Sequence, residues 1–171
     1  KDAAEMEARL EAMASARQQA SMGVTGEGVP MCGAGGSYGQ PNQLDIDQAY
    51  ILELELKGLL AMLKGQPAEA ERWLQKASAV EDNASYSYGP PEVVKPSYEL
   101  YGEWLLEQDR PEDALRQFER ALERGPLRVR ALRGKLGAAR ALGKEDMAGA
   151  VQQALDEIRA KSEAQQMGQR S

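Results

Sequence analysis

Hydrophobic residues recur at a helical spacing along most of the chain, in stretches separated by Gly and Pro. The pattern predicts helices over residues 1–21, 44–64, 68–80, 96–108, 111–124, 127–142 and 145–163. Asn42, followed three residues later by Asp45, is a capping signal for the second of them. Pro in the first helical turn marks two short helix–helix junctions, Gly65-Gln66-Pro67 and Asp109-Arg110-Pro111. The chain is therefore predicted to be all-α, with neighbouring helices paired as antiparallel hairpins.

Two stretches interrupt the helical pattern. Residues 23–42 are dense in Gly and Pro, which predicts a loop or linker, and residues 82–91 read as a turn-rich insert. The predicted organisation is a helix over 1–22, a Gly-rich loop or linker over 23–43, helical repeats over 44–163 and a polar tail over 164–171.

The helical part contains an internal repeat. The central copy reads Tyr98-x2-Tyr101-Gly102-x2-Leu105, then Ala114-x3-Phe118, Ala121 and Pro126. The upstream copy reads Leu54-x2-Lys57-Gly58-x2-Ala61, then Ala70-x3-Leu74 and Ala77, and a fainter downstream copy reads Leu132-x2-Lys135-Leu136-x2-Ala139, then Ala148. Ala114 and Ala148 lie 34 residues apart, whereas Ala70 and Ala114 lie 44 apart because the insert adds ten. Such a period is typical of stacked helical hairpins.

Small residues recur where the two helices of a hairpin would cross, at Gly58, Gly102, Ala70 and Ala114. Large residues beside them are expected to fill the core, namely Trp73, Leu74, Trp104 and Phe118.

These motifs resemble those of the tetratricopeptide repeat (TPR) family, with repeats at about 51–84, 95–128 and 129–160. The third repeat lacks both the Gly and the aromatic residue. Gly89-Pro90-Pro91, with the segments 99–106 and 110–114, is similar to the C-terminal repeats of larger bacterial TPR proteins. The resemblance implies a short right-handed solenoid in which the first helix of each hairpin lines a concave groove. Helix 1–21 would then be the second helix of an earlier repeat.

Composition excludes several kinds of chemistry. The chain has no histidine and a single cysteine, Cys32, so it can form no Ser-His-Asp triad, no Cys-His pair, no His-ligated metal site and no internal disulfide. The net charge of −6 argues against general nucleic-acid binding, and no apolar stretch is long enough to span a membrane. A lone cysteine favours a reducing, cytoplasmic location and leaves a periplasmic one open. We therefore expect a protein without enzymatic activity, cofactor or metal.

Three groups of residues have the composition of possible binding or catalytic sites. The run Gly33–Gly39 is not followed by Gly-Lys-Ser/Thr, so it is no phosphate loop. Met31 and Cys32, with Met22 nearby, are soft donors of the kind that bind Cu(I), although coincidence is the simpler interpretation. The carboxylates Asp45, Asp47, Glu53 and Glu55 are expected to form a solvated helix face.

The concave groove is the remaining candidate. Counted from the aligned repeats, its exposed inner face is predicted at Leu52, Glu55, Leu59, Met62, Glu99, Glu103, Leu106, Arg130, Arg133, Gly137 and Arg140. One end is acidic and apolar and the other is rich in Arg, which departs from the carboxylate clamp of chaperone-binding TPR domains. The other arginines between 110 and 144 are expected to form solvated pairs with Glu112, Asp113, Glu119 and Glu123.

The leading hypothesis is a non-catalytic scaffold that binds a mixed-charge peptide or a partner domain in this groove, with the acidic part of the partner at Arg130, Arg133 and Arg140. An equally open interpretation is that these arginines only pair with Glu103. The second class of function is structural, with the repeats packing or self-associating as the C-terminal segment of a longer TPR protein. The third is an enzyme or metal protein that uses residues 23–42.

Overall fold

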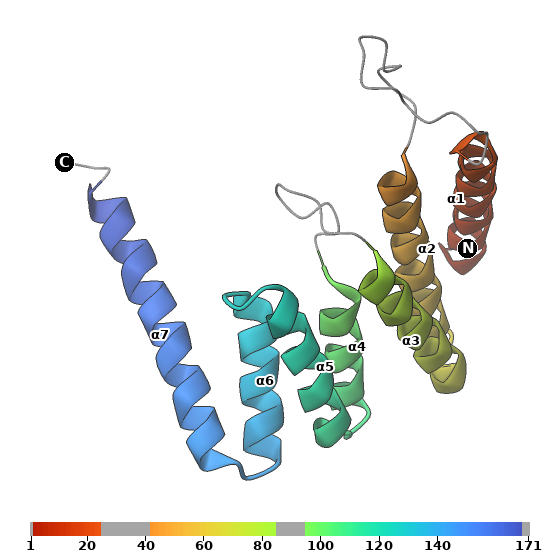
Figure 1. Cartoon of the computed structure of the whole chain (residues 1–171). Helices are drawn as coiled ribbons and strands as arrows, with labels where there is room; N and C mark the ends of the chain where they lie inside the picture. Colours follow the sequence, from red (N-terminus) through yellow and green to blue (C-terminus); the bar gives the residue numbers. More distant parts are fainter. Residues whose placement is uncertain (1, 25–41, 85–94, 169–171) are drawn as a thin grey trace. The chain divides into compact units, whose positions relative to one another are not determined.

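The computed structural model describes residues 2–24, 42–84 and 95–168, and every regular element in them is an α-helix (Figure 1). The helices are α1 (Asp2–Val24), α2 (Gln43–Leu63), α3 (Pro67–Asn83), α4 (Ser97–Glu107), α5 (Pro111–Arg124), α6 (Val129–Ala141) and α7 (Glu145–Gly168). The all-α prediction is therefore confirmed for the described residues. Residues 25–41 of the predicted linker, with Met31, Cys32 and the Gly33–Gly39 run, lie outside them, whereas residues 23 and 24 belong to α1.

The chain forms two compact units, residues 1–97 and residues 98–171, called unit 1 and unit 2 below. Unit 1 contains 14 acidic and 8 basic residues, whereas unit 2 contains 13 of each. The acid excess of the chain therefore belongs to unit 1, and unit 2 is formally neutral.

The helix ends follow local sequence signals. At the start of α2, the Asn42 side chain accepts from the Asp45 N–H and the Asp45 carboxylate accepts from the Asn42 N–H, at 3.1 and 2.7 Å, which confirms the predicted capping box. Pro67 and Pro111 open α3 and α5 as predicted. Three helices run further than predicted, because α1 continues to Val24, α3 to Asn83 and α7 to Gly168, so residues 164–168 of the predicted tail are helical.

Three interhelical turns share one backbone geometry. Gly65, Asp109 and Gly143 have φ of 67°, 55° and 65°, in the left-handed region that ends many helices. The residue after each of them donates its N–H to the carbonyl five positions earlier, at 2.9 Å in all three turns. The same turn therefore recurs at intervals of 44 and 34 residues, with Asp109 in left-handed conformation where the other two turns have Gly.

In unit 1, α2 and α3 approach each other at small residues. A Cβ on Gly58 would lie 3.1 Å from Leu74 Cδ2 and 3.7 Å from the Ala70 carbonyl oxygen, so the predicted close approach is confirmed. Leu54, Leu74 and Ala70 are fully buried there. Trp73, predicted in the core, is only half-buried.

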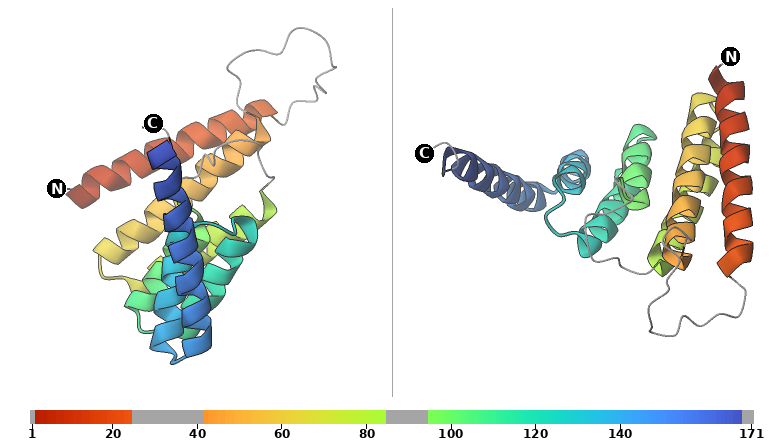
Figure 2. Two further views of the ribbon diagram at one scale, coloured as in Figure 1. Left: turned by 90° about the vertical axis from the view of Figure 1, so that its left-hand side faces the viewer. Right: turned by 90° about the horizontal axis from the view of Figure 1, so that it is seen from above.

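Helix α1 lies beside α2 in each view (Figure 2). Among its described residues only Leu10 is a buried apolar side chain. Its apolar residues do not gather on one face, so it has no broad stripe to bury. Polar contacts, described below, therefore hold much of α1 in place.

In unit 2, one aromatic ring joins three helices. The same edge of the buried Phe118 ring on α5 faces Gly102 of α4 and Gly134 of α6, where added Cβ atoms would lie 2.9 and 2.2 Å from it. The aligned position of the third repeat holds Leu136, as the sequence indicates, and the small residue of α6 that faces Phe118 is Gly134, two positions earlier.

Helices α6 and α7 pack through Leu132, Leu136 and Ala139 of α6 and Ala148 and Val151 of α7. Leu155 and Ile158 pack against this cluster from half-buried positions, so the apolar contacts of α7 end near its middle. The helix has 24 residues and α6 has 13, so α7 continues beyond the end of its neighbour by about 11 residues, or about 16 Å.

Candidate functional site

The predicted groove residues are divided between the two units, and the structure places them very differently. Leu52 on α2 is exposed, and Leu59 and Met62 are half-buried. Glu55, in contrast, is 6% exposed. The prediction that Glu55 faces solvent is wrong, and so is the prediction that Glu53 and Glu55 lie on a solvated face.

Glu55 is part of a buried polar cluster in unit 1. The Ser97 hydroxyl donates to Glu55 Oε1 at 3.0 Å, and the Ser97 N–H donates to Glu81 Oε2 at 2.6 Å. Burial raises the pKa of Glu55 to about 7, with a further rise from the neighbouring Glu81 charge and opposing contributions from the Ser97 hydrogen bond and from Lys95. Sequence analysis missed Glu81, whose partner Ser97 lies 16 residues away.

Glu53 has the opposite electrostatic setting. It is 2% exposed and accepts from Arg17 of α1 at 2.9 Å and from Lys57 at 2.5 Å. Burial by itself raises the pKa of this carboxyl, but the two hydrogen bonds and the two positive charges outweigh it, so the pKa lies below its ordinary value. Glu53 is therefore a charged anchor between α1 and α2.

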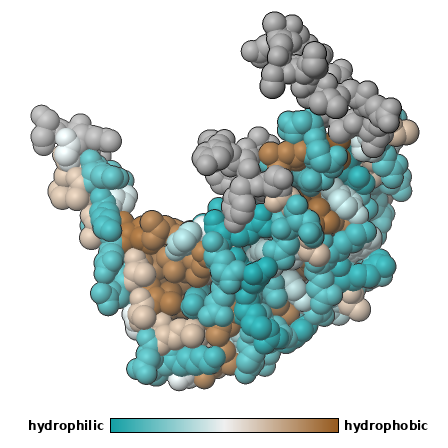
Figure 3. Space-filling model, in the orientation of Figure 1, coloured by the Kyte–Doolittle hydropathy of each residue, from teal (hydrophilic) through white to brown (hydrophobic). Residues whose placement is uncertain are grey.

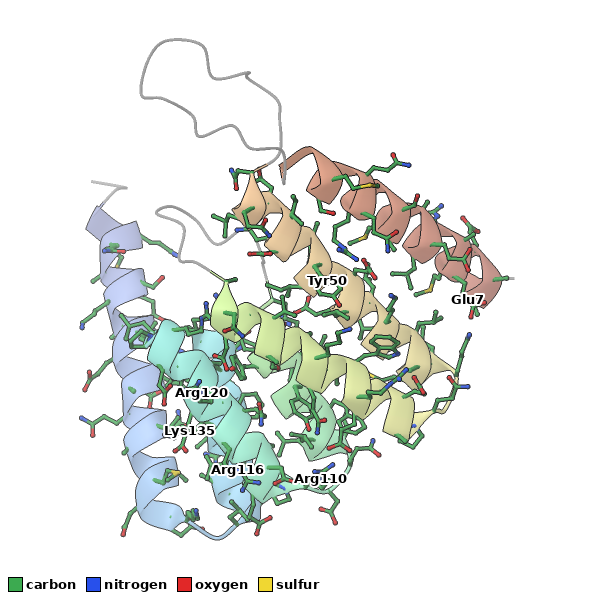
Figure 4. All side chains as sticks on the ribbon, turned by 45° about the vertical axis from the view of Figure 1, so that its right-hand side comes forward. Glu7, Tyr50, Arg110, Arg116, Arg120 and Lys135 are labelled. Atoms are coloured by element: carbon green, nitrogen blue, oxygen red, sulfur yellow. The ribbon has the colours of Figure 1, made fainter. Side chains whose placement is uncertain are left out.

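Cations lie over the aromatic rings of unit 1. The Arg17 guanidinium is 4.2 Å from the centre of the Tyr50 ring, and Figure 4 shows Tyr50 on α2 beneath α1. The ring of Trp73 has Arg72 at 4.5 Å and Lys57 at 5.0 Å. These contacts explain why Trp73 stays at the surface: its indole packs against the stems and charges of long side chains instead of entering the core.

In unit 2, Glu99 is also buried, which corrects the prediction that it faces the groove. It is fully enclosed and accepts from Arg128 Nε at 2.5 Å and from Arg128 Nη2 at 3.3 Å. The pair joins the first turn of α4 to the residue before α6. A buried carboxylate requires such a partner, because an unpaired charge there is costly.

Other groove candidates of unit 2 remain accessible. Glu103 of α4 and Arg130 of α6 form a long ion pair at 4.0 Å, with about a third of the Glu103 side chain and two thirds of the Arg130 side chain exposed. Leu106 is half-buried, 3.7 Å from where a Cβ on the exposed Gly137 would lie. Exposed pairs of this kind are weak, so Arg130 is available to another anion.

Arg140 and Arg133 complete the exposed arginines of α6. Arg140 donates to the Gln152 side chain of α7 at 3.3 Å. Arg133 has no hydrogen bond or ion pair with another described residue. It lies at the edge of a cleft between α6 and α7.

That cleft is open to solvent and is lined by residues of both helices. It has a volume of about 560 Å³. Its lining includes four apolar residues, Val129 and Leu136 of α6 and Leu155 and Ile158 of α7. Figure 3 shows the apolar surface in the hollow between these two helices. Sequence analysis did not find it, because the pattern predicted two helices of similar length, 127–142 and 145–163, whereas α6 has 13 residues and α7 has 24.

The arginines of α5 are solvated, as predicted, although their pairs are spaced i,i+3. Arg110 and Arg116 both bond Asp113, and Arg120 bonds Glu123 at 2.6 Å. Lys135 of α6 reaches Glu119 of α5 at 3.0 Å, and Figure 4 shows it with these arginines along α5 and α6. Glu112, in contrast, makes no ion pair with another described residue, so the ion pairs along α5 use the carboxylates of Asp113, Glu119 and Glu123.

Within residues 2–24, 42–84 and 95–168, no three His, Cys, Asp or Glu side chains come together as metal ligands would. The helices in these ranges are each too short or too polar to cross a bilayer. Comparison of the chain with protein-family models, with curated proteins and with solved structures found no match.

Proposed function

We propose that this chain is a non-catalytic, TPR-like scaffold that binds a segment of a partner protein, and that unit 2 carries the binding surface. The observation that carries the proposal is the row of exposed arginines on α6, at 130, 133 and 140, beside accessible apolar surface. A formally neutral unit that concentrates exposed guanidinium groups on one helix is suited to carboxylates of a partner.

The repeated hairpin geometry supports the TPR-like part of the proposal. The left-handed turn residue recurs at 65, 109 and 143, and the last interval is the 34-residue TPR period. Gly58 and Gly102 lie at interhelical contacts, as close-packed hairpins require. Repeats of this kind usually serve as binding surfaces, although fold by itself does not establish function.

The test is affinity capture of partners on the full chain and on a variant with Arg130, Arg133 and Arg140 changed to Glu. We expect at least a tenfold loss of the captured partner. The control variant changes Arg116, Arg120 and Arg124 to Glu, which alters the net charge equally on α5. Equal capture by all three proteins contradicts the assignment of the α6 surface.

A second candidate function is self-association through unit 1. Leu52, Leu56 and Leu63 are exposed and share one face of α2, and Leu56 also lines an apolar hollow with Met6, Leu10 and Met13 of α1. Sedimentation of the wild-type chain and of Leu56→Glu tests it. A concentration-dependent dimer that the substitution abolishes favours this function over the first.

A further inference from the structure

The cleft between α6 and α7 has the chemistry of a helix-binding site. Its lining contains Val129, Leu136, Leu155 and Ile158, with Arg133 from α6 and Arg159 from α7. Neither arginine has a hydrogen bond or ion pair with another described residue. One carboxylate, Glu163, also lines the cleft, so the two positive charges are not balanced locally.

We infer that this cleft binds one amphipathic α-helix of a partner protein, with the apolar face of that helix on the cleft floor and acidic residues on its flanks against Arg133 and Arg159. The inference rests on the proposed function and names its partner class. It places the site between the two helices of the last hairpin, whereas the groove predicted from sequence used the exposed side of α6.

The length of the cleft fits a helix of about four turns. Its lining on α7 runs from Gln152 to Gln166, which spans about 21 Å along the helix axis. The C-terminal half of α7 extends beyond α6, and residues 159–168 are all exposed. A third helix in this position would contact both of the others, as helices do when side-chain ridges enter a groove.

The apolar floor favours a helix over an extended peptide. An extended strand would turn unpaired backbone N–H and C=O groups towards Val129, Leu155 and Ile158, which offer no hydrogen-bonding partner. A helix satisfies its own backbone and presents side chains alone. The two arginines, one on each wall, then select acidic flanks.

The probe is a synthetic 18-residue helical peptide with Leu along one face and Glu on both flanks, compared with the same peptide carrying Lys in place of Glu. Fluorescence anisotropy with the full chain measures both dissociation constants. We expect the Glu peptide to bind at least tenfold more tightly than the Lys peptide. In Arg133→Glu/Arg159→Glu this preference should reverse, and in the control Arg116→Glu/Arg120→Glu it should persist.

A second variant tests the apolar floor. Ile158→Asp introduces a charge at a half-buried position of α7, and we expect it to weaken binding of both peptides at least tenfold while helix content by circular dichroism is unchanged. Equal affinities of wild type and Arg133→Glu/Arg159→Glu for the Glu peptide, or no binding of it at millimolar concentration, overturn the inference. A dimer of the chain that Ile158→Asp dissociates also overturns it, because the occupant is then a second copy.

Two variants distinguish an error in the cleft assignment from an error in the proposed function. Arg130 and Arg140 do not line the cleft, whereas Arg133 and Arg159 do. If Arg130→Glu/Arg140→Glu reduces partner capture and Arg133→Glu/Arg159→Glu does not, the binding surface of unit 2 stands and the cleft assignment is wrong.

Discussion

The pKa of a buried carboxylate in this protein depends on the groups that surround it. Glu53 and Glu55 are two residues apart on α2, and both are buried. At Glu53 two cations outweigh burial and lower the pKa, whereas at Glu55 burial, with the charge of a second carboxylate, raises the pKa to about 7. Neighbouring positions on a helix point to different sides, so adjacent carboxylates meet different elements.

Glu55 should make unit 1 less stable as the pH rises towards neutrality. Its pKa in the folded protein, about 7, lies above the unfolded value of 4.5, so the contribution is complete below pH 4.5 and is lost as the pH passes through 7. The expected fall in unfolding free energy between these values is on the order of 3 kcal/mol. Urea unfolding of the wild-type chain at pH 4.5, 6 and 8 measures it.

Glu55→Gln should remove this dependence, because the amide keeps an acceptor for Ser97 and carries no charge. Glu112→Gln, at an exposed position, is the matched control and should keep the wild-type profile. Glu53 does not contribute to the change in unfolding free energy above pH 4.5, because its lowered pKa reduces stability only as the pH falls below about 4.5. An unchanged slope in Glu55→Gln would show that another group titrates.

At the scale of the helices, close approach depends on particular glycines and on particular ion pairs. Gly102 and Gly134 leave room for the edge of Phe118, and Leu10, Glu7 and Arg17 attach α1 to its neighbour through few contacts. Each of these contacts can be tested by a single substitution with a matched control elsewhere in the same unit.

Gly134→Ala should destabilise unit 2 by about 1–3 kcal/mol, because its methyl group would meet the buried Phe118 ring at 2.2 Å. The ring has little room to retreat, since the same edge already faces Gly102. Gly149→Ala on α7 is the control: nothing lies within 4 Å, and replacing a mid-helix Gly should stabilise by about 0.5–1 kcal/mol. Thermal unfolding measures the stability of both variants. Equal effects of the two substitutions would contradict the close approach of Gly134 to Phe118.

Arg17→Met should loosen α1 without unfolding the rest of unit 1. The substitution removes a charged hydrogen bond to the buried Glu53, worth about 1.5–3 kcal/mol, while Lys57 still compensates the carboxylate. Amide hydrogen exchange in α1 should accelerate at least tenfold, with α2 and α3 little changed. Arg9→Met, which removes an exposed i,i+4 pair with Glu5, should leave exchange within twofold of wild type. If Arg17→Met has no greater effect than Arg9→Met, apolar contacts hold α1.

At the scale of the whole chain, two compact units with separate cores should respond separately to damage. The core of unit 1 contains Ile51, Leu54 and Leu74, and that of unit 2 contains Leu105 and Phe118. The acid excess also belongs to unit 1 alone.

Phe118→Ala should cost unit 2 about 3–5 kcal/mol and increase hydrogen exchange chiefly in α4, α5 and α6, the helices that the ring joins. Leu54→Ala, which should cost about 2–5 kcal/mol, is the reciprocal variant and should act chiefly on α2 and α3. Exchange that rises equally in all seven helices for either substitution would show one cooperative unit.

The sequence by itself determined the helices, their caps and the small residues at the two main crossings. Such features depend on contacts within about five residues, as in the Asn42–Asp45 box, or on a repeated spacing of small and large side chains. Asp109 in a left-handed turn was not predicted, but the Pro111 that follows it marked the junction correctly.

Only the tertiary structure decided which polar residues are buried and where a partner has room to bind. Glu55 and Ser97 are 42 residues apart, Arg17 and Glu53 are 36 apart, and Glu99 and Arg128 are 29 apart. Helical periodicity assigns a residue to a face of its own helix, but it does not say whether another helix covers that face. The α6–α7 cleft exists for the same reason, since it depends on the unequal lengths of two packed helices.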